Sequence, residues 1–384
     1  MVYDPKMKDI LVNRDLTKRG FACAAIAFAM MGFTSTSWGP MLPWIAERSQ
    51  LSISNSGLIL AGFTLNTLIG TVVVQIFGPK KDLIWFIRRG ITIAFIGFIG
   101  VVTFYSALLV FLSGCFAGLG YGATGIALLQ LFTRSSNASH LRMNLASAAT
   151  GAGALAGPFT IAMVGTNYIP LIIIFSIGSS FTATLFMTGA AWKVEKYSHS
   201  SQTKKNKFRL IMILLAITFY SGLENSIGAW LPTIISNVNG TLESGALSSA
   251  LFYFFFSIGR FVGVFLAKYL EPPNIILICI ISTIVPFSLA LFFQSNLGLL
   301  LGFCGLFLGP IFPNSSSWIA SKTPGFPLAT TVLMLSIMFG GFLFPPILGF
   351  ILESTGEVGF MYGLTTLLLL SVTLFVSSYI KWRK

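Results

Sequence analysis

The chain has 384 residues, of which 55% are hydrophobic and only 9% are Asp, Glu, Lys or Arg, and its formal net charge is +13. Because a soluble domain carries about a quarter of its residues as charged ones, this composition excludes an ordinary soluble protein and indicates a chain solvated mainly by lipid. The four cysteines lie in apolar runs without close pairing or a nearby His, so the sequence indicates neither a disulfide framework nor a zinc site.

Apolar runs long enough to cross a hydrocarbon core of about 30 Å recur along the chain. They predict twelve transmembrane helices, at residues 20–46, 53–77, 90–106, 107–133, 141–165, 168–192, 209–235, 245–270, 273–293, 296–320, 326–352 and 358–380. Residues 1–19 lack the features of a removable signal peptide, so we expect the first span to be retained.

The basic residues are distributed unevenly about these spans. Every Lys and Arg except Arg48 and Arg260 falls on the side that the N-terminal tail occupies. By the positive-inside rule, both termini are expected in the cytoplasm, and the positive charge is a topology signal rather than a nucleic-acid-binding patch. We therefore expect a multi-pass protein of the plasma membrane (the cell inner membrane), a monomer whose partners are the lipid bilayer and a small-molecule substrate, with no nucleic acid.

Short motifs of the first half recur in the second half at a nearly constant offset of about 188 residues. They are Leu42-Pro43 and Leu231-Pro232, Ser56-Gly57 and Ser244-Gly245, Gly118-Leu119 with Gly122 and Gly305-Leu306 with Gly309, and Gly153 with Pro158 and Gly341 with Pro346. This internal repeat predicts an N-terminal six-helix bundle with its tail at 1–192, a cytoplasmic linker at 193–208 and a C-terminal six-helix bundle with a short tail at 209–384. Two similar bundles can rock about a site at their interface, which is what alternating access requires.

Four segments of the second half resemble the major facilitator superfamily, and within it the branch of fucose permeases and glucose/galactose transporters, the fucose:proton symporter family. They read "YSGLENSIGAWLPTII" from Tyr220, "SIGRFVGVFLAKYLEPPN" from Ser257, "GLFLGPIFPN" from Gly305 and "GGFLFPPILGFILESTG" from Gly340. The resemblance implies an all-α integral membrane fold with twelve transmembrane helices in two pseudo-symmetric six-helix bundles, and a secondary transporter that works by alternating access.

The sequence departs from that family in two places. The loop after the second span keeps the basic pair Lys80-Lys81 but lacks the Asp of the superfamily's loop motif. Spans one and four contain no carboxylate, whereas fucose permeases resemble one another in placing essential carboxylates there. Their proton site is therefore not transferred to this chain.

Two ionisable residues lie inside predicted spans: Glu224 is the only deep carboxylate, and Arg260 lies in the next span. Such a side chain costs about 2.5–3.5 kcal/mol in hydrocarbon, so it usually faces a partner or an aqueous cavity and serves a function. The helical rise places the two at depths that differ by about one turn, which permits pairing. Two interpretations remain open: a proton-coupling site formed by Glu224 and Arg260, or a fixed salt bridge between spans seven and eight.

Amides and aromatic rings lie near mid-depth in several spans. The candidate substrate-binding residues are Asn225, Trp38, Asn66, Tyr121, Gln130, Tyr220, Trp230, Tyr253, Asn314 and Trp318. Amides bond hydroxyl groups and aromatic faces cover the C–H surface of a sugar ring, so this set suits a neutral polyol, although packing is the alternative for any single aromatic residue. Pro310 and Pro313 are expected to interrupt the tenth span beside Asn314.

We expect proton-coupled uptake of a small neutral polar solute such as a monosaccharide. The alternative within the same fold is a proton-coupled efflux carrier for drugs or metabolites, since Gly153, Gly157 and Pro158 partly match an antiporter motif, for which close helix packing is the other explanation. A membrane receptor or an embedded enzyme is the alternative from other classes. The spans contain no catalytic constellation and no metal-ligand cluster, so we expect no enzyme, no cofactor and no metal beyond a proton or sodium as coupling ion.

Overall fold

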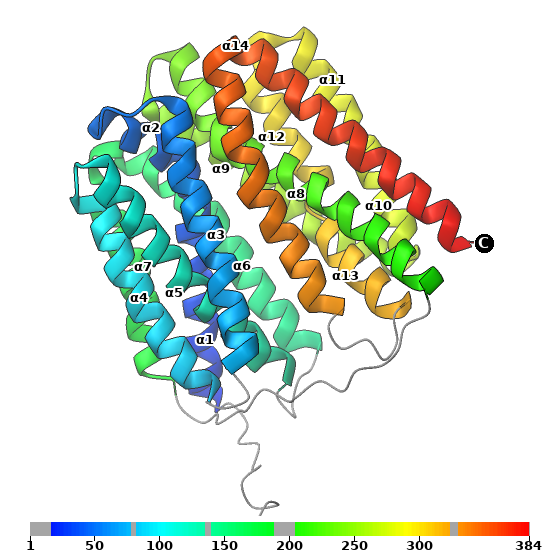
Figure 1. The fold of residues 1–384 in the computed structure, drawn as a ribbon, viewed down its shortest axis with the longest axis horizontal. Coiled ribbons are helices and arrows are strands. Elements are labelled where there is room, and N and C mark those ends of the chain that lie inside the picture. The colour runs from blue at the N-terminus through cyan, green and yellow to red at the C-terminus, as the bar shows by residue number, and fades with distance from the viewer. Residues whose placement is uncertain (1–16, 78–81, 135–139, 188–203, 323–328, 384) are drawn as a thin grey trace, which may run out of the picture.

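The computed structural model describes residues 17–77, 82–134, 140–187, 204–322 and 329–383. The described part of the first half contains α1 (Lys18–Thr36), α2 (Trp38–Arg48), α3 (Ile53–Phe77), α4 (Leu83–Thr103), α5 (Ala107–Arg134), α6 (His140–Val164), the 3₁₀ turn η3 (Thr166–Tyr168) and α7 (Ile169–Leu185). The second half contains α8 (Lys204–Asn239), α9 (Leu242–Leu266), α10 (Pro272–Ser282), α11 (Ile284–Phe292), η4 (Gln294–Asn296), α12 (Leu297–Leu308), α13 (Ile311–Lys322) and α14 (Ala329–Arg383). Figure 1 shows α1–α7 gathered on one side of the molecule and α8–α14 on the other.

Twelve membrane-crossing helices account for these elements. Within the described ranges, length and composition mark nine stretches as able to cross a membrane, and the bent pair α1–α2 makes a tenth. The last stretch, Val332–Lys381, has 50 residues where one crossing needs about 20, and it turns at Gly356, whose φ of 71° favours glycine. α6 has 25 residues, and its apolar stretch Ala149–Val164 is shorter than the other spans. With α6 included, each predicted span has its helix, and the predicted all-α fold is confirmed.

Three predicted boundaries differ most from the structure. One of them is the end of the sixth span, expected at residue 192, because α7 ends at Leu185. The third span was expected to begin at residue 90, but α4 begins at Leu83, because the charged pair Arg88-Arg89 does not interrupt a helix whose long side chains can extend toward the membrane surface. The predicted linker 193–208 ends in the first turn of α8, which begins at Lys204. Residues 193–203 of that linker, the N-terminal tail before residue 17 and the Lys80-Lys81 pair lie outside the described residues.

Three spans are bent or broken inside the membrane. The first bends by 49° between α1 and α2 at Ser37, just before Pro40, which has no N–H to continue the helical bonds. The ninth breaks at Thr283, close to Pro286. The tenth breaks between α12 and α13 at Gly309-Pro310, as the prolines predict, and the Asn314 amide donates to the Pro310 carbonyl oxygen at 2.7 Å.

The sequence repeat corresponds to a repeat in packing. On α5, a Cβ atom added at Gly118 or at Gly122 would lie 2.0 Å from a backbone oxygen of α3. At the matching glycines of the second half, Gly305 and Gly309, added Cβ atoms would lie 2.5 and 2.2 Å from backbone oxygens of α9. Glycine is therefore required at the same helix crossing in each half, because any side chain would separate the two backbones.

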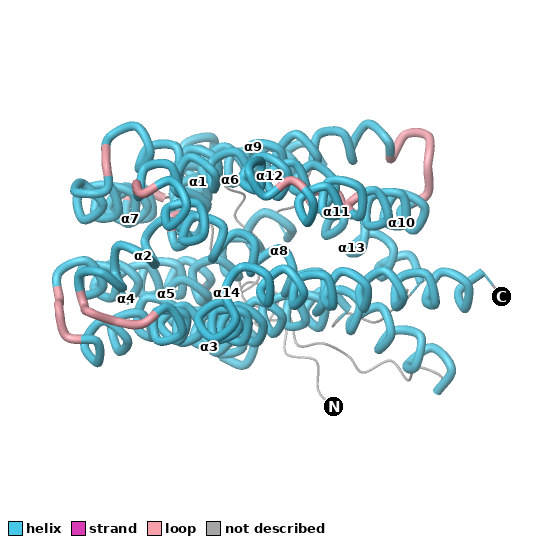
Figure 2. The backbone as a smooth tube through the Cα atoms, turned by 90° about the horizontal axis from the view of Figure 1, so that it is seen from above, coloured by secondary structure: helices cyan, strands magenta, loops and turns pink. Residues whose placement is uncertain are grey.

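The two halves are closed against each other at one end. We call the end at which Lys18 begins α1 the near end, and the opposite end, at which Arg48 lies, the far end. In the view from above, α3 and α14 lie in one layer and α6 and α9 in the other, so each layer crosses from one half to the other (Figure 2).

Buried packing shows the same asymmetry between the ends. One buried apolar cluster runs through both halves and includes Trp38, Ile59 and Trp230. A second cluster, around Ala24, Leu83 and other near-end residues, contains residues of the first half alone. Among the described residues, the halves therefore share a core toward the far end and have no common buried cluster at the near end.

Candidate transport site

Glu224 lies in the middle of α8, where glycines allow aromatic side chains from other helices to approach. An added Cβ at Gly222 would lie 2.2 Å from the Phe344 ring of α14, and one at Gly228 would lie 2.5 Å from the Tyr253 hydroxyl of α9. The side chain of Glu224 is half-buried and interacts electrostatically with Tyr220 and Tyr253. The "YSGLENSIG" pattern thus places one carboxylate beside two tyrosine side chains.

Arg260 lies near Glu224 without contacting it. The two charges are close enough to interact, but no ion pair within 4.0 Å joins them in the part of the chain that the structure describes. The Arg260 guanidinium lies over the Phe256 ring, 4.6 Å from its centroid, and its buried Nε has no hydrogen-bond partner. Glu224 and Arg260 therefore form no ion pair in this conformation, and an ion pair between them in another conformation stays a prediction.

Asn225 is the most accessible of the predicted substrate-binding residues. Its side chain is exposed, and its Nδ2 donates to the Ser221 carbonyl oxygen at 2.8 Å and to the Ser221 hydroxyl at 3.1 Å. An added Cβ at Gly341 of α14 would lie 3.3 Å from the Asn225 amide carbon. An amide that faced hydrocarbon would be costly, so we interpret this exposed surface as the aqueous side of α8.

Three further predicted residues are half-buried: Asn66 on α3, Tyr121 on α5 and Tyr253 on α9. The Asn66 amide donates to the Gly62 carbonyl oxygen at 2.9 Å, and the Tyr121 hydroxyl donates to the Met31 carbonyl oxygen at 2.9 Å. Each keeps acceptor or donor capacity for a ligand after these bonds.

The other predicted substrate-binding residues are buried in this conformation: Trp38, Gln130, Tyr220, Trp230, Asn314 and Trp318. The Tyr220 hydroxyl donates to the Leu308 carbonyl oxygen at 3.0 Å, and the Trp230 indole donates to the Pro345 carbonyl oxygen at 2.7 Å. Trp38 packs against the Phe63 ring, with centroids 4.9 Å apart. The structure therefore gives Tyr220 and Trp230 hydrogen-bond partners and Trp38 a packing partner, and a role in binding stays a prediction.

Sequence reasoning missed two groups of residues. Ser35 on α1 and Ser257 on α9 are half-buried at mid-depth, but a serine hydroxyl in a helix gives no sequence signal of its own. Glu243 and Glu353 lie just outside the predicted spans 245–270 and 326–352, and both contact the first half at the far end. Each of the two carboxylates matches a residue of the first half in the internal repeat, and this relation appears only when the two halves are compared.

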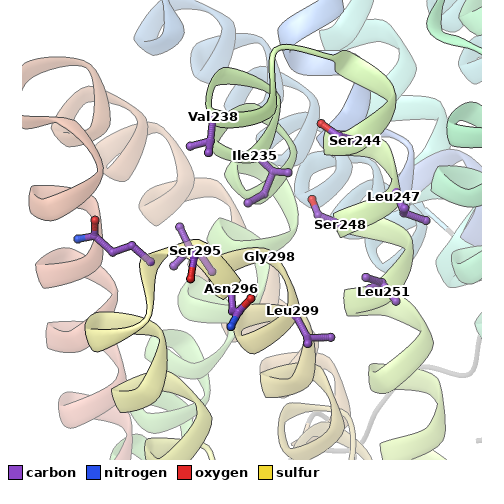
Figure 3. Close-up of a pocket in the computed structure, with 12 residues that line it drawn as sticks. Ile235, Val238, Ser244, Leu247, Ser248, Leu251, Ser295, Asn296, Gly298 and Leu299 are labelled. Carbon is purple, nitrogen blue, oxygen red and sulfur yellow. The ribbon is translucent and has the colours of Figure 1, made fainter.

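A separate pocket of about 240 Å³ lies at the far end of the second half (Figure 3). Ile235 and Val238 at the end of α8, Ser244 and Ser248 on α9 and the η4–α12 segment surround it. Glu224 and Asn225 do not line this pocket, so it is not part of the candidate site. Across the described ranges, no group of three His, Cys, Asp or Glu residues is arranged to bind a metal ion.

No family model matches the chain. The sequence is 24% identical over 318 residues to sodium-dependent glucose transporter 1 of Homo sapiens, an alignment that covers 78% of this chain and 59% of the relative. It is 27% identical over 125 residues to major facilitator superfamily domain-containing protein 4A of Mus musculus, covering 32% of this chain and 24% of the relative. The chain thus spans about three fifths of the first relative's length and less of the second.

Solved transporter structures have the same arrangement of helices. The nucleoside transporter NupG, in a mutant form, superimposes with a TM-score of 0.75 at 13% identity, covering 94% of this chain and 99% of that one. An inward-facing, occupied bacterial homologue of the lysosomal transporter Spinster gives 0.71 at 12% identity and covers 100% and 98%. The major facilitator superfamily transporter FucP, in its outward conformation, gives 0.65 at 17% identity and covers 94% and 98%. These relatives and structures are named for transport or for the superfamily and none for catalysis, and the resemblance is confirmed: the chain is a membrane protein with the major facilitator fold.

Proposed function

We propose that the protein is a secondary transporter that takes up a small neutral polar solute, such as a monosaccharide, by alternating access between its two six-helix bundles, 1–192 and 209–384. The observation that supports this best is the pair Glu224 and Asn225 at mid-depth of α8, one half-buried and one exposed, beside hydroxyl groups of α9. A carboxylate and an amide side by side bond the hydroxyl groups of a polyol without requiring a charged solute. The glucose and nucleoside transporters among the similar proteins add weight to a hydroxyl-rich solute.

The first experiment is uptake by the purified protein in proteoliposomes. Labelled monosaccharides and nucleosides are offered under an inward proton gradient, an inward sodium gradient and no gradient. We expect accumulation of one neutral, hydroxylated solute under one of the two gradients. Failure of every neutral solute, together with outward movement of apolar cations, would replace this proposal by the efflux alternative.

The efflux alternative has less support from helix packing than from sequence. An added Cβ at Gly153 would lie 1.8 Å from the Ala29 carbonyl oxygen, and one at Gly157 would lie 2.4 Å from the Phe33 carbonyl oxygen. The partial antiporter motif of α6 is thus explained by close packing on α1. Efflux is therefore the second candidate rather than the first.

Glu224 is proposed to bind a coupling proton. It is a carboxylate at mid-depth that interacts with the charge of Arg260 without forming an ion pair with it in this conformation. A helix movement that brings Arg260 into contact would favour the ionised acid, and one that separates them would favour the protonated acid, so proton affinity would alternate with the transport cycle. The human relative is a sodium-dependent glucose transporter, which favours sodium instead, and the coupling experiment distinguishes the two ions.

The coupling experiment uses Glu224→Gln, which keeps the shape and hydrogen-bonding capacity of the side chain without its charge. We expect this variant to lose proton-driven accumulation while counterflow of labelled solute down its own gradient persists. Asp82→Asn, which changes a carboxylate outside the spans, is the control and is expected to accumulate solute normally. Proton-driven accumulation by Glu224→Gln would remove Glu224 from the coupling mechanism, and accumulation driven by sodium alone would assign the coupling to sodium.

Both termini are proposed to lie in the cytoplasm of a cell bounded by this membrane, which makes the far end extracellular and the described conformation inward-facing. Single cysteines test this orientation. One replaces Lys268, by the near end, and the other replaces Ser295, at the far end, and both of these side chains are exposed. An impermeant thiol reagent added to intact cells is expected to label the Ser295→Cys variant alone. Labelling of the Lys268→Cys variant alone would reverse the orientation.

A further inference from the structure

Two carboxylates of the second half bond to the first half at the far end. Glu353 accepts a hydrogen bond from the backbone N–H of Ser54 at 2.6 Å. Glu243 accepts from the backbone N–H of Thr166 at 3.3 Å and from the Thr166 hydroxyl at 3.2 Å. We call these bonds the two carboxylate contacts.

The two carboxylate contacts are related by the internal repeat. Ser54, in the first turn of α3, matches Glu243, in the first turn of α9, at nearly the offset of the repeated motifs. Thr166 matches Glu353 in the same way. Both contacts therefore join the same two positions of the repeat. The acid occupies the second of these positions in the contact of Glu353 with Ser54, and the first in the contact of Glu243 with Thr166. A chance surface contact would not be expected to occur twice at matched positions.

Each carboxylate bonds a backbone N–H that has no partner inside its own helix. The first four N–H groups of a helix lack an internal acceptor, and Ser54 is the second residue of α3. Thr166 follows Gly165, whose φ of 103° turns the chain at the end of α6, and it opens the segment that continues into α7. Negative charge is favoured at such positions, because the unpaired N–H groups carry partial positive charge.

Both contacts lie at the far end, where backbone and aromatic packing also join the halves. An added Cβ at Gly57 of α3 would lie 2.8 Å from the Trp230 ring, and one at Gly349 of α14 would lie 2.4 Å from the same ring. Trp230 is fully buried there. Any opening of the far end must separate α3 from α8 and α14, and this movement breaks the bond between Ser54 and Glu353.

We propose that the two carboxylate contacts stabilise the state that is closed at the far end, and that both must break before solute can enter or leave there. Both carboxylate side chains are exposed, so water can replace the N–H donors when the halves separate. This proposal does not depend on which solute or ion is transported. It requires only that the two bundles move against each other.

The test measures how often the far end opens, in a chain whose four cysteines are replaced by serine and whose Ser257, at mid-depth, is replaced by cysteine. An impermeant thiol reagent is applied only to the face of the membrane on which the Ser295→Cys variant is labelled, and the modification rate of the new cysteine is recorded. Because a rarely open state reacts in proportion to its population, the rate reports the ratio of open to closed protein. No transported solute is needed for this measurement.

We expect Glu243→Ala and Glu353→Ala each to raise the modification rate about two- to fivefold. This range corresponds to the free energy of an exposed charge at a helix N-terminus. The double variant should raise the rate further. Glu243→Gln and Glu353→Gln keep an acceptor oxygen without the charge and should give a smaller rise, which guards against a folding defect of the alanine variants. Glu357→Ala, on the same far-end turn as Glu353, is the matched control and should react as the parent does.

Two results would overturn the proposal. One is a double alanine variant that is folded, as judged by a single symmetric peak in size-exclusion chromatography, and still reacts at the parent rate. The other is a Glu357→Ala variant that reacts as fast as the double variant, because a general loss of negative charge at the far end would then explain the effect. Neither result depends on whether the variants transport solute, so a failure of this proposal can be distinguished from a failure of the proposed function.

Discussion

Gly39 offers a direct test of the closed far end, because its helix crosses a helix of the other half without room for a side chain. A Cβ atom added at Gly39, on α2, would lie 2.2 Å from the carbonyl oxygen of Gly228 on α8. Real Cβ atoms essentially never approach a heavy atom within 3.0 Å, so Gly39→Ala must move the two backbones apart by about 0.8 Å. The clash exists only while the halves are closed at this end.

The magnitude follows from the cost of overpacking, which is about 1–3 kcal/mol when extra methyl groups enter a packed interface. Since about 1.4 kcal/mol is a tenfold change in an equilibrium constant, Gly39→Ala should raise the ratio of far-end-open to far-end-closed protein about five- to 150-fold. The gain in helix propensity from Gly to Ala applies to both states and therefore cancels from this ratio.

The assay is the modification rate of the cysteine at position 257 by an impermeant thiol reagent from the far side. Gly32→Ala, on α1, is the control, since its added Cβ would lie 2.3 Å from the Thr150 carbonyl oxygen of α6, in the same half. We expect Gly32→Ala to lower the melting temperature of the protein and to leave the modification rate unchanged. If Gly39→Ala also leaves the rate unchanged in a folded protein, the far end is not closed by this helix crossing and the reasoning is wrong.

Three further predictions concern stability and charge. Gly122→Ala should lower the melting temperature, because overpacking against α3 costs about 1–3 kcal/mol, whereas Gly125→Ala on the same helix should not, since its added Cβ would meet only a flexible Met side chain at 3.4 Å. Arg48→Gln should also lower the melting temperature, because the guanidinium donates to two carbonyl oxygens at the end of α4; an unchanged value would show these bonds to be dispensable. Arg260→Gln alone should impair folding or transport more than Arg260→Gln with Glu224→Gln, and a double variant no better than the worse single one would contradict pairing in any state.

Several features of the fold followed from local sequence properties. Span number follows from apolar length, and the break of the tenth span follows from Pro310, since a proline removes a backbone bond in any context. The matched glycines Gly122 and Gly309 predict a structural repeat from the sequence alone. What the sequence did not reveal is the cause: these glycines lie where two backbones cross, which depends on which helices pack together.

Only the tertiary structure shows which of the predicted residues lie at the candidate site. Glu224 and Asn225 were identified from sequence because a polar residue in a long apolar run is locally conspicuous. Trp230, on α8, has the same local features as a ligand-binding aromatic residue, yet its ring is buried against α3 and α14, because helix packing decides what each face of α8 contacts.

By itself, the sequence determined that the chain crosses the membrane twelve times, that its two halves are repeats and that one carboxylate lies at mid-depth, because hydropathy, periodicity and charge are local properties. Only the tertiary structure decided that Glu224 and Arg260 are neighbours without being paired, and that Glu353 bonds the N–H of Ser54. Those relations join residues on different helices, and they change when the two halves move, so they belong to one conformation of the protein rather than to its sequence.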